Sequence, residues 1–578
     1  MSENESFESA PGTDPKRRSA PDPEDVAAAM SAESEPVDVD SDVEPEPEPW
    51  TPEKVIEWNS YYDKYVMLGA LLLIFVVSAN RLTNSTFWTH LKTGELILSN
   101  QAPVTTNIFS YTEPDRRWVD IPWIFQATHA AIYQFTHDFI PINEVDKVAS
   151  LEKAEQISIG VLIGLNALAR LLTGFLLLRI RRPGPGLWWS AICAVLALGV
   201  IWGPSGIMLG GIAHPATVTP ATWGLLMLAL EVYLLHRAFT LGSRNSLLLL
   251  VPVFVLWANL DETFVLGLLV LAASGEGHLL DLRAKKAPVI QNKAKARVDE
   301  ETTDPAARST APSLAFIVLG VSVLACLLNP SFHRVYPEAF APIIHVFTAS
   351  GDIQTPDQIS FLNPTLRASI GADWRLAAAF FGAIASVGLV SFFVNRERFR
   401  WSRLLPYLVS LGFAILLLRY VPEFAILFAA ILSINGQEWY LGRFGTEGKL
   451  GGSWTFWSTG GRLVTLAIIF LMVGKAITGY QNSETDPVFG FSYRPDDFAF
   501  DSAEALNKAD INGNVFNTTL GQGDAIIWKS GPRRKTFLDG RPNFFDQALL
   551  ERFQKIRRAL KDDDVADWKP ELDKDGIS

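Results

Sequence analysis

The sequence predicts an all-α polytopic membrane protein with about eleven transmembrane helices and a small C-terminal α/β module outside the membrane. Long apolar runs recur along the chain, for example at 68–79, 159–178 and 463–474. At ~1.5 Å rise per residue, about twenty apolar residues match the hydrocarbon thickness of a bilayer. Short, strongly basic connectors separate these runs, and the runs stop after residue 480.

The N-terminal segment 1–52 is predicted to be a disordered, acidic, cytoplasmic tail. Residues 1–50 hold 15 Asp and Glu against three basic residues, so they carry the whole net charge of −12. A segment this polar buries too little apolar surface to offset its ordering entropy. The rest of the chain is charge-balanced, and we expect no nucleic-acid partner. An acidic start also differs from the basic start of a signal peptide, so the first span is expected to be an uncleaved anchor.

The membrane domain is expected to cover 53–480, and its spans follow from the apolar run lengths. The runs at 245–260 and 262–281 meet at Asp261 and Glu262. Two carboxylates in mid-membrane are costly, so we expect a tight turn at a membrane surface there. The expected spans lie at about 64–81, 157–179, 187–204, 217–238, 245–260, 262–281, 313–329, 373–394, 402–419, 421–436 and 462–480.

The basic connectors predict the orientation, because Lys and Arg collect in cytoplasmic loops. With the N-terminus inside, each basic connector is cytoplasmic, whereas the opposite loops at 205–216 and 260–262 hold no Lys or Arg. An odd number of spans then places the C-terminus outside the cytoplasm, in a protein of the cell inner membrane. The connectors are marked by Arg179, Arg181 and Arg182, by Arg237 and Arg244, by 283–308, and by Arg396, Arg398, Arg400 and Arg403.

Two regions are predicted to lie outside the membrane. The large first outer loop, 82–156, contains two amphipathic helices at 86–98 and 123–135, and we expect Trp88, Trp118 and Trp123 at headgroup level. The module at 481–578 is expected to be α/β. Its helices are predicted at 501–510 and 546–560, and its strands at 513–517, 524–529 and 535–540.

Common catalytic signatures are missing from the sequence. It contains no GxxxxGKS loop, no HExxH and no GxSxG, and its histidines have no metal-ligand spacing along a helix. Cys193 and Cys326 both lie in apolar runs, which argues against a disulfide framework or a cysteine metal site. The polar residues on the predicted outer side are the remaining candidates, namely His90, Asp120, Asp261, Glu262, His333, Arg334 and Arg419.

These candidates also have structural interpretations. His333 and Arg334 follow a span end, where snorkelling to the interface is the favoured interpretation. For the Asp261–Glu262 pair and for Asp120, a functional role and ordinary loop solvation remain equal alternatives. Arg541 lies in Asp539-Gly540-Arg541, which either pairs within the module or faces a carboxylate or phosphate at the membrane-proximal cleft.

Several motifs in fixed order resemble those of a large group of bacterial multi-pass membrane proteins. Two motifs lie in the first outer loop: FWTHLKTGELIL (87–98), and PVTTNIFSYT followed by PWIFQ. The others are WANLDETFVLGLLVL (257–271), LLNPSFHRVY (327–336) and VFNTTLGQGDAIIW…FLDGR (515–541). That group is similar to the GT-C class of membrane glycosyltransferases. The resemblance covers roughly 60–540 and implies a GT-C-like fold with a large first outer loop that carries an acidic catalytic residue.

The resemblance implies transfer of sugar from a polyprenyl-phosphate carrier on the outer face of the membrane, with membrane lipid as a partner. The family usually has a carboxylate just before its WWHL stretch, which corresponds to FWTHL in this sequence; that carboxylate is missing here, where 80–86 reads NRLTNST. We therefore assign the base to Asp120 and a second acid or metal ligand to Asp261 or Glu262. His90, Arg117, Arg419 and Arg541 are assigned to substrate, and a divalent metal stays open as a cofactor.

A different class of function competes with this one. The missing carboxylate also fits a non-catalytic membrane scaffold or envelope-assembly protein that binds through its outer module. A transporter is less favoured, because the sequence shows no inverted halves with broken helices.

Overall fold

The computed structural model describes residues 52–114, 116–182, 187–202, 218–286, 312–348, 374–444, 459–478, 489–508, 514–541 and 544–577. The predicted disordered tail and most of the loops predicted at 205–216 and 283–308 lie outside these residues. Within them the fold is helical, and no strand longer than a single bridge occurs.

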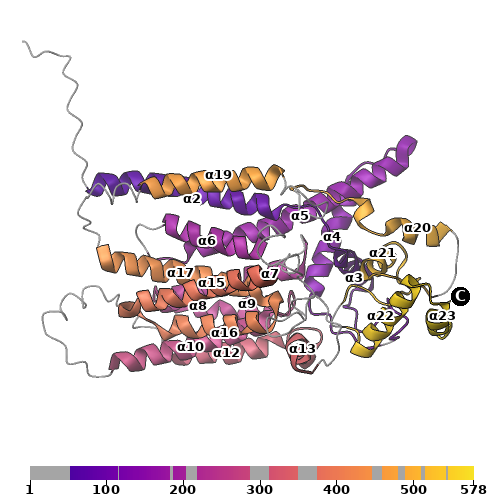
Figure 1. The fold of residues 1–578 in the computed structure, drawn as a ribbon. Coiled ribbons are helices and arrows are strands. Elements are labelled where there is room, and N and C mark those ends of the chain that lie inside the picture. Colours follow the sequence, from indigo (N-terminus) through magenta and orange to yellow (C-terminus); the bar gives the residue numbers. More distant parts are fainter. Residues whose placement is uncertain are drawn as a thin grey trace, which may run out of the picture. The chain divides into compact units, whose positions relative to one another are not determined.

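A helix occupies each predicted span, because apolar runs of this length satisfy their backbone groups internally as helices (Figure 1). The run at 245–260 is divided at Leu249 into two short helices. The helices are α2 (Pro52–Ser78), α5 (Lys147–Arg179), α6 (Leu187–Trp202), α7 (Pro220–Phe239), α8 (Asn245–Leu248), α9 (Leu250–Trp257), α10 (Phe264–Lys286), α12 (Pro312–Cys326), α15 (Trp374–Val394), α16 (Trp401–Leu416), α17 (Val421–Phe444) and α19 (Gly461–Thr478).

The chain is a membrane protein by the length and composition of these helices. Among the described residues, five helical stretches are each long and apolar enough to cross a bilayer. They are Glu57–Ser78, Lys147–Arg179, Phe264–Ala284, Leu418–Tyr440 and Gly461–Thr478.

Helix α17 lies at the centre of the bundle and packs against α6, α7, α15 and α16. It is almost wholly buried, whereas α19 contacts mainly α2 and leaves most of its apolar surface exposed. An apolar surface facing lipid costs little, so α19 needs no covering helix. Helix α10 packs closely on α16, and α5 packs on α7.

One end of the bundle is joined by a buried ionic network. The Glu438 carboxylate on α17 accepts hydrogen bonds from Arg182 after α5 at 2.6 Å and from Arg403 on α16 at 2.6 and 2.8 Å. Asn395, at the end of α15, donates to it at 2.9 Å. The Glu438 carboxylate therefore connects the ends of α5, α15, α16 and α17.

The first outer loop contains α3 (Thr86–Asn100) and α4 (Trp123–Phe139), as predicted, and they pack on each other. The close approach requires Gly94, since a Cβ there would lie 2.1 Å from the Gln126 carbonyl oxygen. The expected headgroup position of Trp88 is wrong. Its side chain is fully buried among Tyr493, Phe498, Phe500 and Trp528, with ring centroids 5.0–5.5 Å apart.

The C-terminal region is helical, with α20 (Phe500–Lys508), α21 (Leu520–Ser530), α22 (Gln547–Lys561) and α23 (Val565–Asp573). The strand predicted at 524–529 is wrong, because these residues lie inside α21. The Thr519 hydroxyl accepts from the Gln522 amide at 3.1 Å and begins that helix. The strands predicted at 513–517 and 535–540 are reduced, in the described residues, to two single bridges of Thr536, one with Val515 and one with Ser110.

The remaining elements are short or lie at helix ends. They are η1 (Glu144–Asp146), η3 (Phe332–Arg334), α13 (Val335–Thr348), η6 (Arg396–Arg398), η7 (Leu418–Tyr420) and η9 (Pro495–Asp497).

Candidate functional site

Asp120 is buried just before α4. Its Oδ1 accepts a hydrogen bond at 2.8 Å from Nε2 of Gln126, six residues along the chain in α4. Its Oδ2 is buried and has no hydrogen-bonding partner among the described residues. Since native proteins rarely leave a buried carboxylate oxygen unpaired, this oxygen is available to a ligand.

Burial gives the Asp120 carboxyl a pKa suited to a general base near neutral pH. Desolvation raises the pKa of its carboxyl to about 7, although the Gln126 hydrogen bond and the Arg541 charge both oppose the rise. His90 on α3 lies beside the same amide, with Nδ1 3.2 Å from Gln126 Nε2. Burial, aided by the Arg541 charge, lowers the pKa of His90 to about 4, so its ring is neutral.

Arg541 brings the C-terminal region to this carboxylate. Its guanidinium binds Asp539 through Nε at 2.8 Å and Nη2 at 2.6 Å, and Nη2 also donates to Asn107 Oδ1 at 2.9 Å. The guanidinium lies 4.5 Å from the ring centroid of Trp118 and 4.4 Å from that of Phe544. Its Nη1 is buried without a hydrogen-bonding partner in the described part of the chain.

A second buried carboxylate joins the first outer loop to α21. Asp524 accepts from the Ser85 hydroxyl at 2.8 Å, from the Thr89 hydroxyl at 2.7 Å and from the Gly540 amide at 2.8 Å. A carboxylate therefore lies beside Ser85, supplied from residue 524. Burial raises the pKa of Asp524 to about 6. Its three donors all belong to the protein, which indicates a structural role.

Asp261 and Glu262 form a turn before α10, as predicted. Asp261 Oδ2 accepts from the Thr263 amide at 3.0 Å, and Glu262 forms an ion pair with Arg419 of η7. Burial raises the pKa of Asp261, against the Thr263 hydrogen bonds and the Arg419 charge. Gly224 on α7 makes room for this carboxylate, since a Cβ would lie 2.6 Å from Oδ2.

The two acidic groups are linked through the start of α4. Trp123 Nε1 donates to Asn259 Oδ1 at 2.7 Å, and the Ile124 amide donates to the Asn259 carbonyl at 3.3 Å. Asp120 is bound by Gln126, whereas Asp261 is bound by Thr263. The two carboxylates therefore belong to separate, neighbouring clusters, which the contact between Trp123 and Asn259 joins.

The other predicted site residues lie apart from the Asp120 cluster. Arg117 has an exposed side chain, and its backbone forms a bridge with Thr106. His333 is exposed in η3 with Arg334 next to it. Among the described residues, no group of three His, Cys, Asp or Glu side chains could hold a metal ion.

Sequence reasoning missed Gln126, Asn107 and Asp524. Gln126 could have been noticed as a polar residue in an apolar helical stretch. Asn107 and Asp524 lie in ordinary loop and helix sequences. Their partners are hundreds of residues distant along the chain, so no local signal marks them.

No family model matches the sequence, and no curated protein matches it. Solved structures of an oligosaccharyltransferase from Archaeoglobus fulgidus do match. The complex of archaeal AglB with an inhibitory peptide and a dolichol-phosphate has a TM-score of 0.50 and 11% identity, over 84% of this chain and 65% of that chain.

Two other structures of the A. fulgidus oligosaccharyltransferase are similar at 12% identity. One, tethered to an acceptor peptide with an NVT sequon, has a TM-score of 0.46 over 83% of this chain and 65% of that chain. The other, a complex with zinc and sulfate, has a TM-score of 0.43 over 83% and 62%. The chain thus spans just under two-thirds of its neighbours' length. At this identity, the likeness to the first complex shows that the chain has a fold similar to that of the archaeal oligosaccharyltransferase, and nothing finer.

Proposed function

We propose that the chain is a membrane glycosyltransferase that takes a sugar from a lipid-phosphate carrier and passes it to a hydroxyl acceptor on the outer face of the membrane. The observation that carries the proposal is the buried Asp120 carboxyl. One of its oxygens has no hydrogen-bonding partner among the residues that the structure describes, and its pKa of about 7 suits a general base at neutral pH. The fold is of the class to which AglB belongs.

The reaction assigns a role to each group near Asp120. The acceptor oxygen attacks the anomeric carbon of the sugar while Asp120 Oδ2 takes the acceptor proton. The bond between that carbon and the phosphate oxygen breaks, and the lipid phosphate leaves with the bonding electrons. Arg541 Nη1, positively charged and lacking a partner among the described residues, is suited to hold an anionic oxygen. Neutral His90 and Gln126 orient the carboxyl.

Arg419 or the exposed Arg117 is proposed to bind the carrier phosphate, with Asp261 or Glu262 as a second acid or metal ligand. Glu262 neutralises Arg419 in this structure, so a carrier phosphate must replace that carboxylate as the partner of Arg419. The proposal retains about eleven spans in the inner membrane, with the N-terminus cytoplasmic and the C-terminal module outside. The helical C-terminal region takes the place of the expected α/β module.

The test is the amount of lipid-phosphate sugar in a deletion strain, measured by mass spectrometry of extracted lipids. The strain is expected to accumulate the sugar-loaded carrier, and the wild-type chain to clear it. Asp120→Asn keeps the shape of the side chain but cannot accept the proton, so the carrier should stay loaded, with activity reduced by roughly 10²–10⁴-fold.

Asp138→Asn is the matched control, because Asp138 is an exposed acid in the same outer loop. It should clear the carrier as the wild type does. An Asp120→Asn chain that reaches the membrane in normal amount and clears the carrier normally would refute the assignment.

A scaffold remains the second candidate, favoured by a specific observation. Buried Asp524 accepts a hydrogen bond from Thr89 of the first outer loop, and Arg541, which binds buried Asp539, also donates to Asn107 of that loop. Such an arrangement builds a rigid outer surface. If the deletion strain accumulates no sugar-loaded carrier, the scaffold is the better interpretation.

A further inference from the structure

The centre of the helix bundle contains a carboxyl group that the proposed sugar transfer does not use. Glu231 lies on α7, which packs against α5, α10 and α17. Its side chain is fully buried, and neither oxygen has a hydrogen-bonding partner among the described residues. An ionisable residue inside a membrane bundle is costly, so it indicates a function.

The neighbouring helices make room for this carboxyl but provide no counter-charge. A Cβ on Gly267 of α10 would lie 3.0 Å from Glu231 Oε2. The facing stretches 250–257, 264–275 and 424–437 contain no Asp, Glu, Lys, Arg or His. On α5, Arg170 binds Thr222, which lies nine residues, or ~13 Å, along α7 from Glu231. A metal ion needs several ligands, and one carboxylate cannot supply them. A proton is the ligand that fits.

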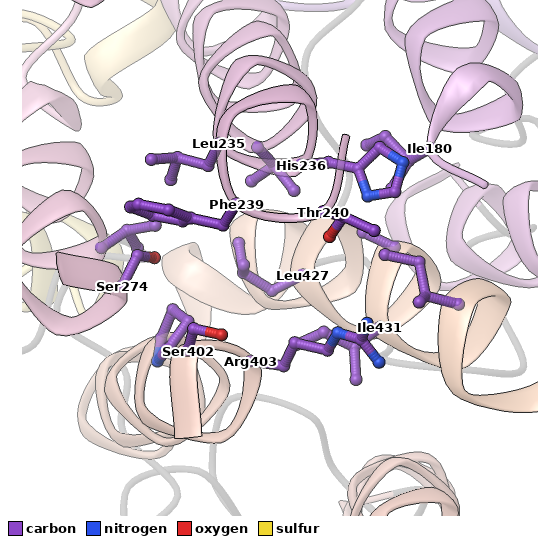
Figure 2. Close-up of a pocket in the computed structure, with 15 residues that line it drawn as sticks. Ile180, Leu235, His236, Phe239, Thr240, Ser274, Ser402, Arg403, Leu427 and Ile431 are labelled. Carbon is purple, nitrogen blue, oxygen red and sulfur yellow. The ribbon is translucent and has the colours of Figure 1, made fainter. Parts of the chain in front are cut away.

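A cavity begins one helical turn from this carboxyl, and its largely apolar wall carries the polar side chains of His236, Thr240, Ser274, Ser402 and Arg403. Figure 2 shows Leu235, His236, Phe239 and Thr240 of α7 across the cavity from Ser402 and Arg403 of α16. Leu235 is four residues after Glu231 on the same face of α7. Val270 and Ser274, which also line the cavity, are three and seven residues after Gly267 on one face of α10.

The cavity can hold water. Its volume is about 60 Å³, and a single water needs about 10–15 Å³. His236 Nε2 lies 3.1 Å from the Arg181 carbonyl, which can only accept, so this nitrogen carries the ring proton. His236 Nδ1 is then an acceptor, and it is buried with no partner in the described part of the chain. An unpaired buried acceptor at the wall of a cavity, with hydroxyl groups in the same wall, is a setting for an ordered water.

We propose that Glu231 is a proton-binding site inside the membrane, supplied with protons from the Arg403 end of the bundle through this water-filled cavity. The hydroxyls of Ser274 and Thr240 and the Nδ1 atom of His236 hold the water, and Leu235 and Val270 form the last barrier before the carboxyl. This function is independent of sugar transfer, because none of these residues belongs to the Asp120 cluster.

Infrared spectroscopy of the purified full chain tests the proposal, since a protonated carboxyl has its own C=O band, which shifts in D₂O. A band present in the wild type at neutral pH should be lost in Glu231→Gln. Glu231→Asp, which keeps a carboxyl, should move the band and so assigns it even if Glu231→Gln fails to fold.

Ser274→Leu fills the cavity and should slow the D₂O shift of that band about tenfold. Ser274→Ala, the matched control, keeps the cavity open and should exchange at the wild-type rate. A spectrum that neither Glu231 variant changes would mean that this carboxyl holds no proton. Equal exchange rates in Ser274→Leu and Ser274→Ala would show that protons do not pass through this cavity. Either result overturns the proposal.

Discussion

Removal of the Arg541 guanidinium should detach the C-terminal region from the first outer loop. In Arg541→Ala the buried Asp539 carboxylate loses its Nε and Nη2 donors, at 2.8 and 2.6 Å, and Asn107 loses a donor at 2.9 Å. Breaking a buried ion pair from one side costs about 3–5 kcal/mol. The lost contacts with the Trp118 and Phe544 rings add to this cost.

Limited proteolysis of membranes measures this loss, because cleavage follows the open population when reclosing is fast. A loss of about 3 kcal/mol raises that population by roughly a hundredfold. Cleavage within the C-terminal region should rise by at least this factor in Arg541→Ala. Arg533→Ala removes an exposed arginine of the same region and should behave as the wild type.

A double variant separates the ion pair from the remaining contacts. Asp539→Asn with Arg541→Met removes both charges together, so it should be cleaved less than Arg541→Ala alone. If Arg541→Ala resists protease as well as Arg533→Ala does, the structural reasoning is refuted. Lost sugar transfer with intact resistance would then make Arg541 a site residue. Intact transfer with intact resistance would exclude both roles.

Three further outcomes are expected. Transfer by the wild type should rise with pH through about 7 and level off above it, because Asp120 acts as a base only when ionised. A profile without that step in a functional chain would count against Asp120. Glu438→Gln leaves Arg182 and Arg403 without their counter-charge and should lower the free energy of unfolding in detergent by about 3–5 kcal/mol. The control Glu397→Gln changes an exposed residue and should leave that free energy unchanged. Equal free energies of unfolding in the two variants would contradict the role of the ionic network at Glu438. Trp88→Ala removes the side chain at the centre of an aromatic cluster and should destabilise the protein by about 3–5 kcal/mol, measured as increased proteolysis of the C-terminal region. Unchanged resistance to protease would mean that the cluster is not needed to hold the C-terminal region on the first outer loop.

The helix positions in the membrane domain follow from the sequence by itself. Run length and apolar composition are local properties, and a backbone in lipid has few alternatives to a helix. The same reasoning located α3, α4, α20 and α22. The positions of Asp120, Asp261 and Glu262 at the ends of helices were likewise readable from the order of apolar runs and breaks.

The tertiary structure decided whatever depends on contacts between distant segments. The hydrophobic periodicity of a run as short as 524–529 does not distinguish a strand from a helix. The hydrogen bond from the Gln522 amide to the Thr519 hydroxyl caps the start of a helix and favours that conformation. Trp88 is buried by residues about four hundred positions away, and Asp524 supplies a carboxylate beside Ser85. Arg541 reaches the first outer loop in the same way. These hydrophobic and ionic contacts join residues that are far apart in the sequence. A local stretch of sequence therefore never contains both partners and cannot predict the contact.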